Sequence, residues 1–306
     1  MVIILSYWNS VTTMRINVMR YVKELSNRNK IISESTCEAL YEQQNDAYTI
    51  KFVFNGTEDC EINKRKFSIY PDTFAVVNAG TNFCSKIDSI SPVNTFSVSF
   101  GENFIKDFHR TFSSSNENLL DGKEAKGTPP FIESLYPFSG DMRFNVLHLK
   151  SQLDKGLKDE ILINEYLYHC LLNYYKIYDK EVVQKLDKLS FIKTKTREEV
   201  LKRLTLAKEY ISSNYNQNIT LENIAEQACL SVNHLLRTFK EAYEISPYQF
   251  LVQLRLNRAK KLLQTTPYSL NEIVGLVGFE CPSSFIRLFK HTFNITPLKY
   301  RKSRLN

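Results

Sequence analysis

The sequence predicts an α+β protein, with an N-terminal antiparallel β-barrel, helices after it, and a C-terminal all-α domain of two helix-turn-helix modules joined by a long helix. Three observations predict this architecture. Short alternating runs rich in aromatic and β-branched residues precede a long region of helical periodicity. A helical segment near the C-terminus occurs twice, and the basic excess of the chain lies in the same region. The 306 residues are enough for two domains.

Residues 1–35 are expected to form an N-terminal arm, and Met14 is a second candidate start. The longest apolar run, MVIIL, has five residues and lacks the charged start of a signal peptide. No membrane partner is therefore expected. The six cysteines show neither a CxxC pair nor zinc-ligand spacing, which indicates reduced thiols in a cytoplasmic protein.

Residues 36–142 are expected to form the barrel. Its strands are predicted at 48–54, 66–70, 73–79, 82–87 and 95–100, and turn residues such as Asn55-Gly56, Asn63-Lys64 and Ser91-Pro92 separate them. Several short strands at this spacing favour an antiparallel barrel or sandwich. No histidine precedes His109, so neither a metal site nor a cofactor is expected here.

Five phenylalanines of the predicted strands are candidate walls of a ligand pocket. The alternative is that they are ordinary core, since side chains can fill a small barrel. These candidates are Phe52, Phe54, Phe74, Phe83 and Phe96.

Residues 143–196 are expected to form a helical dimerisation segment followed by a linker at 188–196. A short helix at 102–112 and a polar loop at 113–130 precede it. The central helix carries two apolar stripes, so it must be covered on two sides. The barrel covers one side, and either a second copy of the chain or the chain itself covers the other. The stripes are Ile163, Leu167, Cys170, Tyr174 and Ile177, and Tyr168, Leu171, Tyr175 and Tyr178.

The C-terminal domain, residues 197–306, is predicted from a repeat. The run LLRTFKEAYEISPYQF at 235–250 recurs fifty positions later as FIRLFKHTFNITPLKY. Helix starts are predicted from capping chemistry at Thr196 with Glu199, at Thr220, at Ser231, at Ser269 with Glu272, and at Pro282. A helix from Pro247 to Gln264, about 27 Å long, joins the two modules.

Residues 197–303 resemble the DNA-binding domain of the AraC/XylS family of bacterial transcription regulators. The resemblance lies in the runs LSVNHLLRTFK, RLNRAKKLL and VGFECPSSFIRLFKHTFNITPLKYR. Two departures are Glu244 and Asn294, which stand where the family often has glycine at a helix end. The run YPDTFAVVNAGTNF is similar to the strand-turn-strand unit of the cupin-like barrel that commonly precedes this domain. The family implies a homodimer, a small-molecule effector, and RNA polymerase as a partner of an activator.

The charge distribution agrees with double-stranded DNA as a partner. Residues 197–306 hold 16 Lys or Arg and 9 Asp or Glu, a net charge of +7 that equals the net charge of the whole chain. Phosphate neutralisation drives non-specific affinity for DNA. The preceding 196 residues therefore carry no net charge and are expected not to contact DNA.

Leu235 and Phe239 lie four positions apart, as do Phe285 and Phe289, so helix geometry predicts that these residues face the core. The other side of each helix is then expected to face a DNA groove, and its positions match those that contact bases in the family. Arginine can bind guanine, and asparagine adenine, through two hydrogen bonds. The predicted base contacts are Asn233, Leu236, Arg237, Ser283, Ser284, Ile286 and Arg287. The predicted phosphate contacts are Lys240, Lys290, Ser246 and Thr296.

Three functions of the chain are possible on this sequence. The leading one is a ligand-responsive transcription regulator, and the resemblance to the family implies an activator. The second is an enzyme fused to this DNA-binding domain, such as an alkyl-transferring repair regulator. That enzyme needs a zinc-held cysteine cluster near the N-terminus, which Cys37 and Cys60 do not supply, so no enzymatic activity is expected. The third is a regulator whose barrel binds a protein partner or only dimerises.

Overall fold

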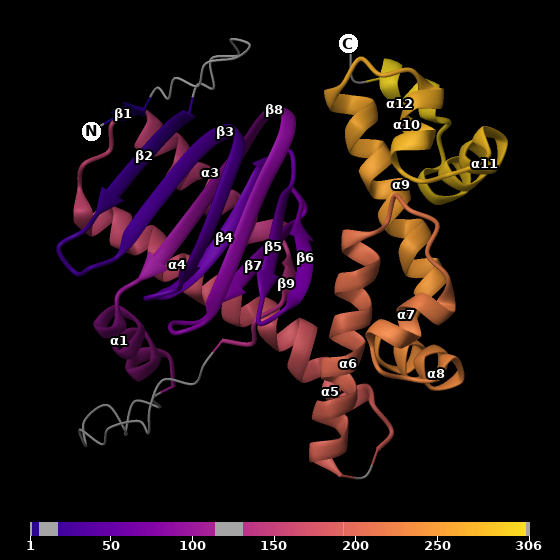
Figure 1. Ribbon diagram of the computed structural model, residues 1–306, viewed down its shortest axis with the longest axis horizontal. Coiled ribbons are helices and arrows are strands. Elements are labelled where there is room, and N and C mark those ends of the chain that lie inside the picture. The colour runs from indigo at the N-terminus through magenta and orange to yellow at the C-terminus, as the bar shows by residue number, and fades with distance from the viewer. Residues whose placement is uncertain (1, 6–17, 114–130, 192, 304–306) are drawn as a thin grey trace. The chain divides into compact units, whose positions relative to one another are not determined.

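The computed structural model of the chain divides into two compact units, residues 1–181 and residues 182–306. It describes residues 2–5, 18–113, 131–191 and 193–303. The first unit contains an antiparallel sheet with helices beside it, and the second consists of helices (Figure 1). This division confirms the predicted order of a β-rich part and a helical part.

Within the described residues, the sheet of the first unit has nine strands. Its main order is β1-β2-β3-β8-β4-β7-β9, while β5 pairs with β6 and with β8. Every pairing is antiparallel. The strands are β1 (Val2–Leu5), β2 (Val18–Glu24), β3 (Lys30–Gln44), β4 (Tyr48–Asn55), β5 (Glu58–Ile62), β6 (Arg65–Ile69), β7 (Thr73–Val77), β8 (Asn82–Phe100) and β9 (Leu135–Pro137).

Strands β3 and β8 are long and irregular, and their two halves organise the sheet. The register of β3 against β8 shifts between Thr36 and Glu38, so residues 30–36 pair with 93–99 and residues 38–44 with 82–88. The sequence predicted two separate strands here, with Ser91-Pro92 between them. The structure joins them into one strand, and Pro92 lies between the paired halves, where its missing N–H removes no bond to β3.

The sheet begins earlier than the predicted boundary at residue 36. Strand β2 and the first half of β3 lie within the predicted arm. Leu25 and Ile31 are buried there, and the buried Asn29 accepts a hydrogen bond from the Gly101 N–H at 2.8 Å. Strand β5 was also not predicted, because its run EDCEI has only two apolar residues, Cys60 and Ile62.

Four of the five candidate pocket phenylalanines pack against one another. Phe52, Phe74 and Phe96 are fully buried. The ring of Phe52 lies 5.4 Å from that of Phe74 and 4.9 Å from that of Phe138, and the ring of Phe54 stacks on that of Phe96 at 5.6 Å. These contacts favour the core alternative for the four residues. Phe83 differs, because it lines two cavities.

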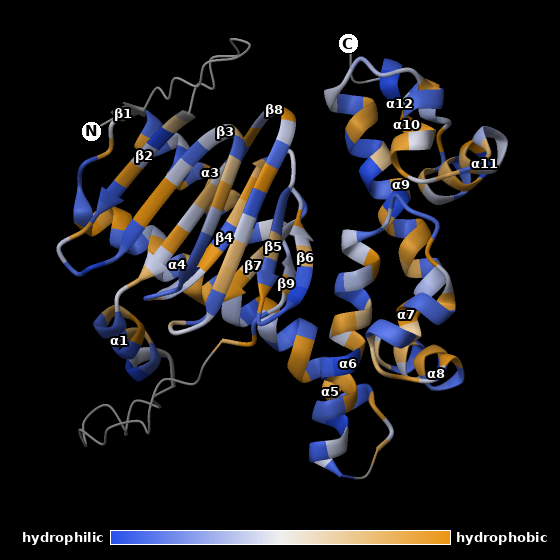
Figure 2. Ribbon diagram, in the orientation of Figure 1, coloured by the Kyte–Doolittle hydropathy of each residue, from blue (hydrophilic) through white to orange (hydrophobic). Residues whose placement is uncertain are grey.

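Helices α3 (Gly140–Asp154) and α4 (Glu160–Tyr178) run along one face of the sheet (Figure 1). Apolar and polar residues alternate along the strands beneath them (Figure 2). Helix α1 (Glu102–Ser113) matches the predicted short helix, and its Phe108 ring lies 5.0 Å from Tyr168 and 5.6 Å from Tyr175. The chain itself therefore contacts the second stripe of α4, for which a second copy was the other candidate.

The second unit is built from helices that form two apolar cores. One core lies among α5 to α9 and includes Leu204, Leu235 and Phe239. The other lies among α9 to α12 and includes Phe285 and Phe289. The π-helix η1 (Asp179–Val183) spans the boundary between the two units. The helices of the second unit are α5 (Gln184–Lys188), α6 (Thr194–Ser213), α7 (Leu221–Gln227), α8 (Val232–Tyr243), α9 (Pro247–Thr265), α10 (Leu270–Leu276), α11 (Pro282–Phe293) and α12 (Pro297–Lys302).

The predicted start of the domain needs two corrections. Helix α6 begins at Thr194 with Lys193 as its N-cap, so the predicted capping box of Thr196 with Glu199 is wrong. Glu199 instead pairs with Arg203 one turn later, at 3.1 Å. The predicted linker is also part of the second unit, because Leu189 is 3 % exposed within the first core of that unit.

No helix in the described ranges is both long and apolar enough to cross a membrane. Within the same ranges, no cluster of three or more His, Cys, Asp or Glu side chains could hold a metal ion. All six cysteines lie in described segments and are free thiols.

Candidate nucleic-acid interface

Helices α8 and α11 are the candidate recognition helices, and their starts follow from the predicted capping residues. The Ser231 hydroxyl accepts the His234 N–H at 3.3 Å at the start of α8. Pro282 is the first residue of α11, as predicted. The preceding short helices begin with capping boxes, formed by Thr220 with Asn223 in α7 and by Ser269 with Glu272 in α10. The repeat in sequence is thus a repeat of helix, turn and helix.

A left-handed residue makes the turn inside each module. Cys229 has φ of 51° in the first module, and Gly278 has φ of 82° in the second. The residue after each turn donates its N–H to a carbonyl of the preceding helix, at 2.9 Å for Leu230 and 3.0 Å for Phe279. Both modules therefore use the same turn, although only one has the glycine that such a backbone favours.

The inward faces of α8 and α11 agree with the predicted pattern. Leu235, Phe239, Phe285 and Phe289 are fully buried. The predicted DNA-facing residues lie on the other side of each helix. Asn233, Arg237, Lys240, Ser283, Arg287 and Lys290 are exposed, and Leu236, Ser284 and Ile286 are half-buried. Each candidate recognition helix thus exposes a guanidinium, a group that can bind two acceptors of guanine.

Helix α9 joins the modules and is fixed by arginines that sequence analysis did not assign. Its 19 residues span about 28 Å at 1.5 Å per residue. The buried Arg258 lies with its guanidinium 3.9 Å from the centre of the Tyr215 ring and donates to the Ser212 carbonyl. Arg255 donates to the carbonyls of Tyr215 at 2.6 Å and Gln217 at 2.7 Å. Burial lowers the pKa of the Arg255 guanidinium below its ordinary value.

The arginines of α9 therefore hold this helix against the end of α6 and the segment after it. In the sequence they are only basic residues of the helix predicted from Pro247 to Gln264. Basic charge alone does not separate a residue that binds phosphate from one that caps backbone carbonyls.

The two departures from the family keep the left-handed backbone of a helix end. Glu244 has φ of 64° and Asn294 has φ of 56°. The Glu244 carboxylate accepts a hydrogen bond from Lys188 at 2.8 Å, which lowers the pKa of that carboxyl below its ordinary value. The contact joins α5 to the end of α8.

The two candidate phosphate-binding helix starts differ. The Ser246 hydroxyl accepts the Gln249 N–H, and the Gln249 side chain accepts the Ser246 N–H at 2.8 Å, so this capping box uses donors of the first turn. The Thr296 side chain makes no such cap, and the exposed Lys299 stands where Gln249 stands in the first module. The helix start at Thr296 thus presents more uncapped backbone N–H groups, and one more positive charge, to an anion than the start at Ser246.

A cysteine at the start of α11 was missed by sequence analysis. Cys281 occupies the N-cap position that Ser231 has in the first module, and its sulfur lies 3.0 Å from the Ser283 hydroxyl. The hydroxyl of Ser283 and the backbone N–H groups of Ser284 and Ser283 lower the pKa of the exposed thiol to about 7. Its place before a recognition helix was visible in the sequence, but the hydrogen bonds were not.

Residues 224–303 match the model of the family described as "Helix-turn-helix domain". Among curated proteins, the chain is 26% identical over 156 residues to the lactose operon transcription activator of Staphylococcus xylosus, covering 51% of this chain and 52% of that protein. It is 28% identical over 160 residues to the raffinose operon transcriptional regulatory protein RafR of Pediococcus pentosaceus, covering 52% of each. It is 29% identical over 93 residues to the melibiose operon regulatory protein of Escherichia coli, covering 30% of this chain and 31% of that protein.

These alignments span about a third to a half of the length of the curated relatives. Among solved structures, the C-terminal domain of the two-component response regulator yesN from Fusobacterium nucleatum is 37% identical, with a TM-score of 0.30. That alignment covers 31% of this chain and 94% of the solved one. The curated relatives named above are transcription regulators.

Proposed function

We propose that this chain, whose C-terminal part is a helix-turn-helix domain of the AraC/XylS type, is a non-enzymatic transcription regulator that binds double-stranded DNA in a sequence-specific way. One observation supports this most. Helices α8 and α11 present similar exposed polar faces from one unit, and helix α9 joins their two modules. The α9 length of about 28 Å is close to one turn of DNA, roughly 34 Å, so the two helices can enter successive major-groove segments.

Within this function, the exposed side chains of α8 and α11 bind base edges. Arg237 and Arg287 suit guanine, and Asn233 suits adenine. Leu236, Ser283, Ser284 and Ile286 complete the two surfaces. Lys240 and Lys290 lie about one turn further along and suit phosphate, together with the helix starts at Ser246 and Thr296.

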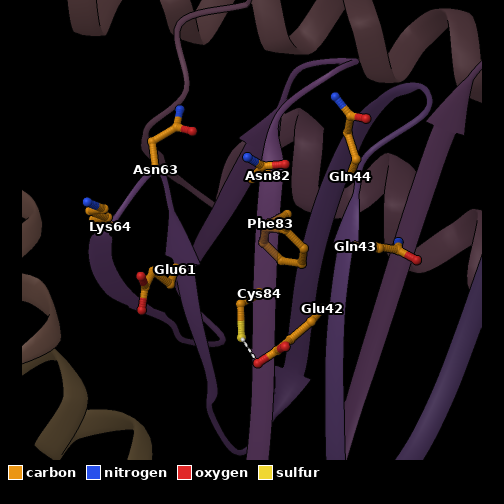
Figure 3. A pocket seen from close by; sticks show the side chains of 9 residues that line it. All are labelled: Glu42, Gln43, Gln44, Glu61, Asn63, Lys64, Asn82, Phe83 and Cys84. Carbon is orange, nitrogen blue, oxygen red and sulfur yellow. Dashed lines mark hydrogen bonds between the residues drawn. The ribbon is translucent and has the colours of Figure 1, made fainter.

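The first unit is proposed to sense a small molecule, to dimerise, or both. Its folded antiparallel sheet is compatible with the cupin-like barrel expected from the sequence. Phe83 lines two cavities of this unit, one of which is drawn in Figure 3. Three relatives carry the names of sugar operons, which makes carbohydrates the first effectors to test. One of them is named an activator, so we propose activation, with RNA polymerase as the partner, in the cytoplasm. The alternative is a first unit that binds a protein or only dimerises.

A homodimer needs an exposed apolar surface. The second stripe of α4 contacts α1, but Phe144 on α3 and Ile161 on α4 are 74% and 83% exposed. We propose that such residues of α3 and α4, within the segment expected to dimerise, contact a second copy. Sedimentation of the full chain at tens of micromolar tests this, and a monomer at that concentration would contradict it.

Selection of genomic fragments on the full chain, followed by sequencing, tests the regulator function and gives the operator. Titrations of Arg237→Ala and Arg287→Ala against that operator and a scrambled duplex then test the assignment. Each variant should lose about 1 to 3 kcal/mol on the operator and relax preference at one base pair. Lys202→Ala, which removes an exposed charge on α6, is the control. If Arg237→Ala binds both duplexes as the parent does, α8 is not a recognition helix.

A further inference from the structure

A short segment before α6 lies alongside the candidate recognition helix α8. It comprises residues 184–191, which include helix α5, and we call it the strap. The Lys188 ammonium binds the Glu244 carboxylate at 2.8 Å. The Ser190 hydroxyl and backbone N–H donate to the Glu241 carboxylate at 3.2 and 3.4 Å. The strap thus binds two carboxylates at the C-terminal end of α8.

Apolar side chains anchor the strap in the first helix-turn-helix module. Leu189 is buried in the apolar core that α8 shares with its neighbours, and Leu186 and Phe191 pack against the same core. The Phe191 ring lies 6.0 Å from the ring of His234, in the first turn of α8. The contacts of the strap therefore extend from the first turn of α8 to its last. All of these strap residues precede residues 224–303, which match the family model.

The positions of the two carboxylates relate them to the surface proposed to bind DNA. Glu241 follows Arg237 by four residues, and Glu244 follows Lys240 by four. Each carboxylate therefore lies one helical turn beyond a basic side chain of that surface. Opposite charges at this spacing attract each other on a helix. A carboxylate without another partner would thus compete with DNA for the neighbouring basic side chain.

The second module provides an internal comparison. Arg287 and Lys290 repeat the two basic side chains of α8, but His291 and Asn294 stand one turn beyond them. Neither of these residues has a carboxylate. Among the described residues, side chains of the strap belong to the first apolar core of the second unit and not to the second core. The module with the two carboxylates is therefore the module that the strap contacts.

We propose that Lys188 and Ser190 are positioning residues that keep the DNA-facing surface of α8 positively charged. Lys188 neutralises Glu244, and Ser190 holds Glu241, so the basic side chains one turn earlier remain available to DNA. Without these contacts, the two carboxylates would attract those side chains and repel phosphate. Residues outside the matched domain thereby set the DNA affinity of the first module. This inference rests on the proposed function, in which α8 binds DNA.

A double-mutant cycle on the full chain tests the proposal, with fluorescence anisotropy against a labelled operator duplex. Lys188→Gln should weaken binding about threefold to tenfold, and the slope of log K against log salt should fall by about one unit, because one phosphate contact is lost. In a chain that already carries Glu244→Gln, the same substitution should change the affinity less than about twofold, since no carboxylate remains to neutralise. Lys202→Gln, on the exposed side of α6, controls for the loss of one positive charge.

Ser190 and Glu241 form a second cycle, which removes no lysine. Ser190 is exposed, so Ser190→Ala leaves the apolar core intact. This substitution should weaken operator binding about twofold to fivefold, because the Glu241 carboxylate loses one hydrogen bond. It should have no effect in a chain that carries Glu241→Gln.

Scrambled half-operators locate the effect. The two halves are assigned by the base preferences that Arg237→Ala and Arg287→Ala relax. The loss caused by Lys188→Gln should persist on a duplex whose second-module half is scrambled, and it should vanish when the first-module half is scrambled.

Three results would overturn the inference. Equal losses for Lys188→Gln with and without Glu244→Gln would show that Lys188 binds phosphate itself. A loss of affinity at an unchanged salt slope would show only a structural defect. Unchanged affinity in both Lys188→Gln and Ser190→Ala would show that the strap does not affect DNA binding. Each of these results leaves the regulator function standing, whereas a parent chain that binds no duplex refutes both.

Discussion

Gly278→Ala should destabilise the second helix-turn-helix module strongly. The glycine has φ of +82°, and a Cβ atom there would lie 2.8 Å from the carbonyl oxygen of Asn216 and 2.9 Å from its Cα atom. Both are backbone atoms and cannot rotate away. The left-handed backbone costs a non-glycine residue about 1 to 2 kcal/mol, and overpacking costs about 1 to 3 kcal/mol. We therefore expect a loss of about 2 to 5 kcal/mol.

Cys229 provides the matched test, because it occupies the same turn in the first module with φ of 51°. Cys229→Gly removes the left-handed strain but makes the unfolded chain more flexible, at a cost of about 0.4 to 1 kcal/mol. The exposed cysteine side chain has little packing to lose. We expect a change between zero and a gain of about 1.6 kcal/mol, opposite in sign to that of Gly278→Ala.

Urea unfolding of the full chain, followed by circular dichroism at 222 nm, measures both changes. Because two units need not unfold together, amide hydrogen exchange with mass spectrometry should locate the effect. Gly278→Ala should lower protection in α10 and α11 about 30-fold or more, at 1.4 kcal/mol per factor of ten. A loss below about 0.5 kcal/mol for Gly278→Ala would refute the reasoning from the turn geometry. A loss above about 0.5 kcal/mol for Cys229→Gly would refute it as well.

Three further predictions concern the second unit. Lys240→Ala and Lys290→Ala should weaken operator and scrambled duplexes alike and reduce the slope of log K against log salt by about one unit each, and a loss on the operator alone would contradict a phosphate contact. Arg258→Ala should destabilise the unit by about 1 to 3 kcal/mol in the urea assay, because the Ser212 carbonyl and the Tyr215 ring lose their partner; a change no larger than that of Lys202→Ala would count against this role. Alkylation of Cys281 by iodoacetamide, followed by peptide mass spectrometry, should reach half its maximal rate near pH 7, since thiolate is the reactive form and its pKa is lowered to about 7. Ser283→Ala removes the donor that lowers this pKa most, so the midpoint should rise, and an unchanged midpoint would show that the hydrogen bond is unimportant.

The sequence determined most of the second unit, because its signals are local. A capping residue and its partner are three positions apart, so Ser269 with Glu272 could be assigned from the chain alone. Helical spacing likewise identified Phe285 and Phe289 as buried and Arg287 as exposed. The failure at Thr196 has a physical cause, since α6 starts two residues earlier and its N-cap, Lys193, makes no side-chain capping bond, so no capping signal marks this start.

Only the tertiary structure decided which residues of the sheet pack in the core and which line a cavity. Alternation along a strand shows that two faces differ, but it does not show which face meets a cavity. The sequence therefore left the phenylalanines open between a pocket and the core. In the structure Phe52, Phe74 and Phe96 pack on the helix-covered face, and polar residues of the other face line a cavity of about 110 Å³. Arg20, Glu58 and Ser97 are far apart in sequence, and they meet because β3 and β8 pair along both halves of the folded sheet. No local pattern records such long-range pairing.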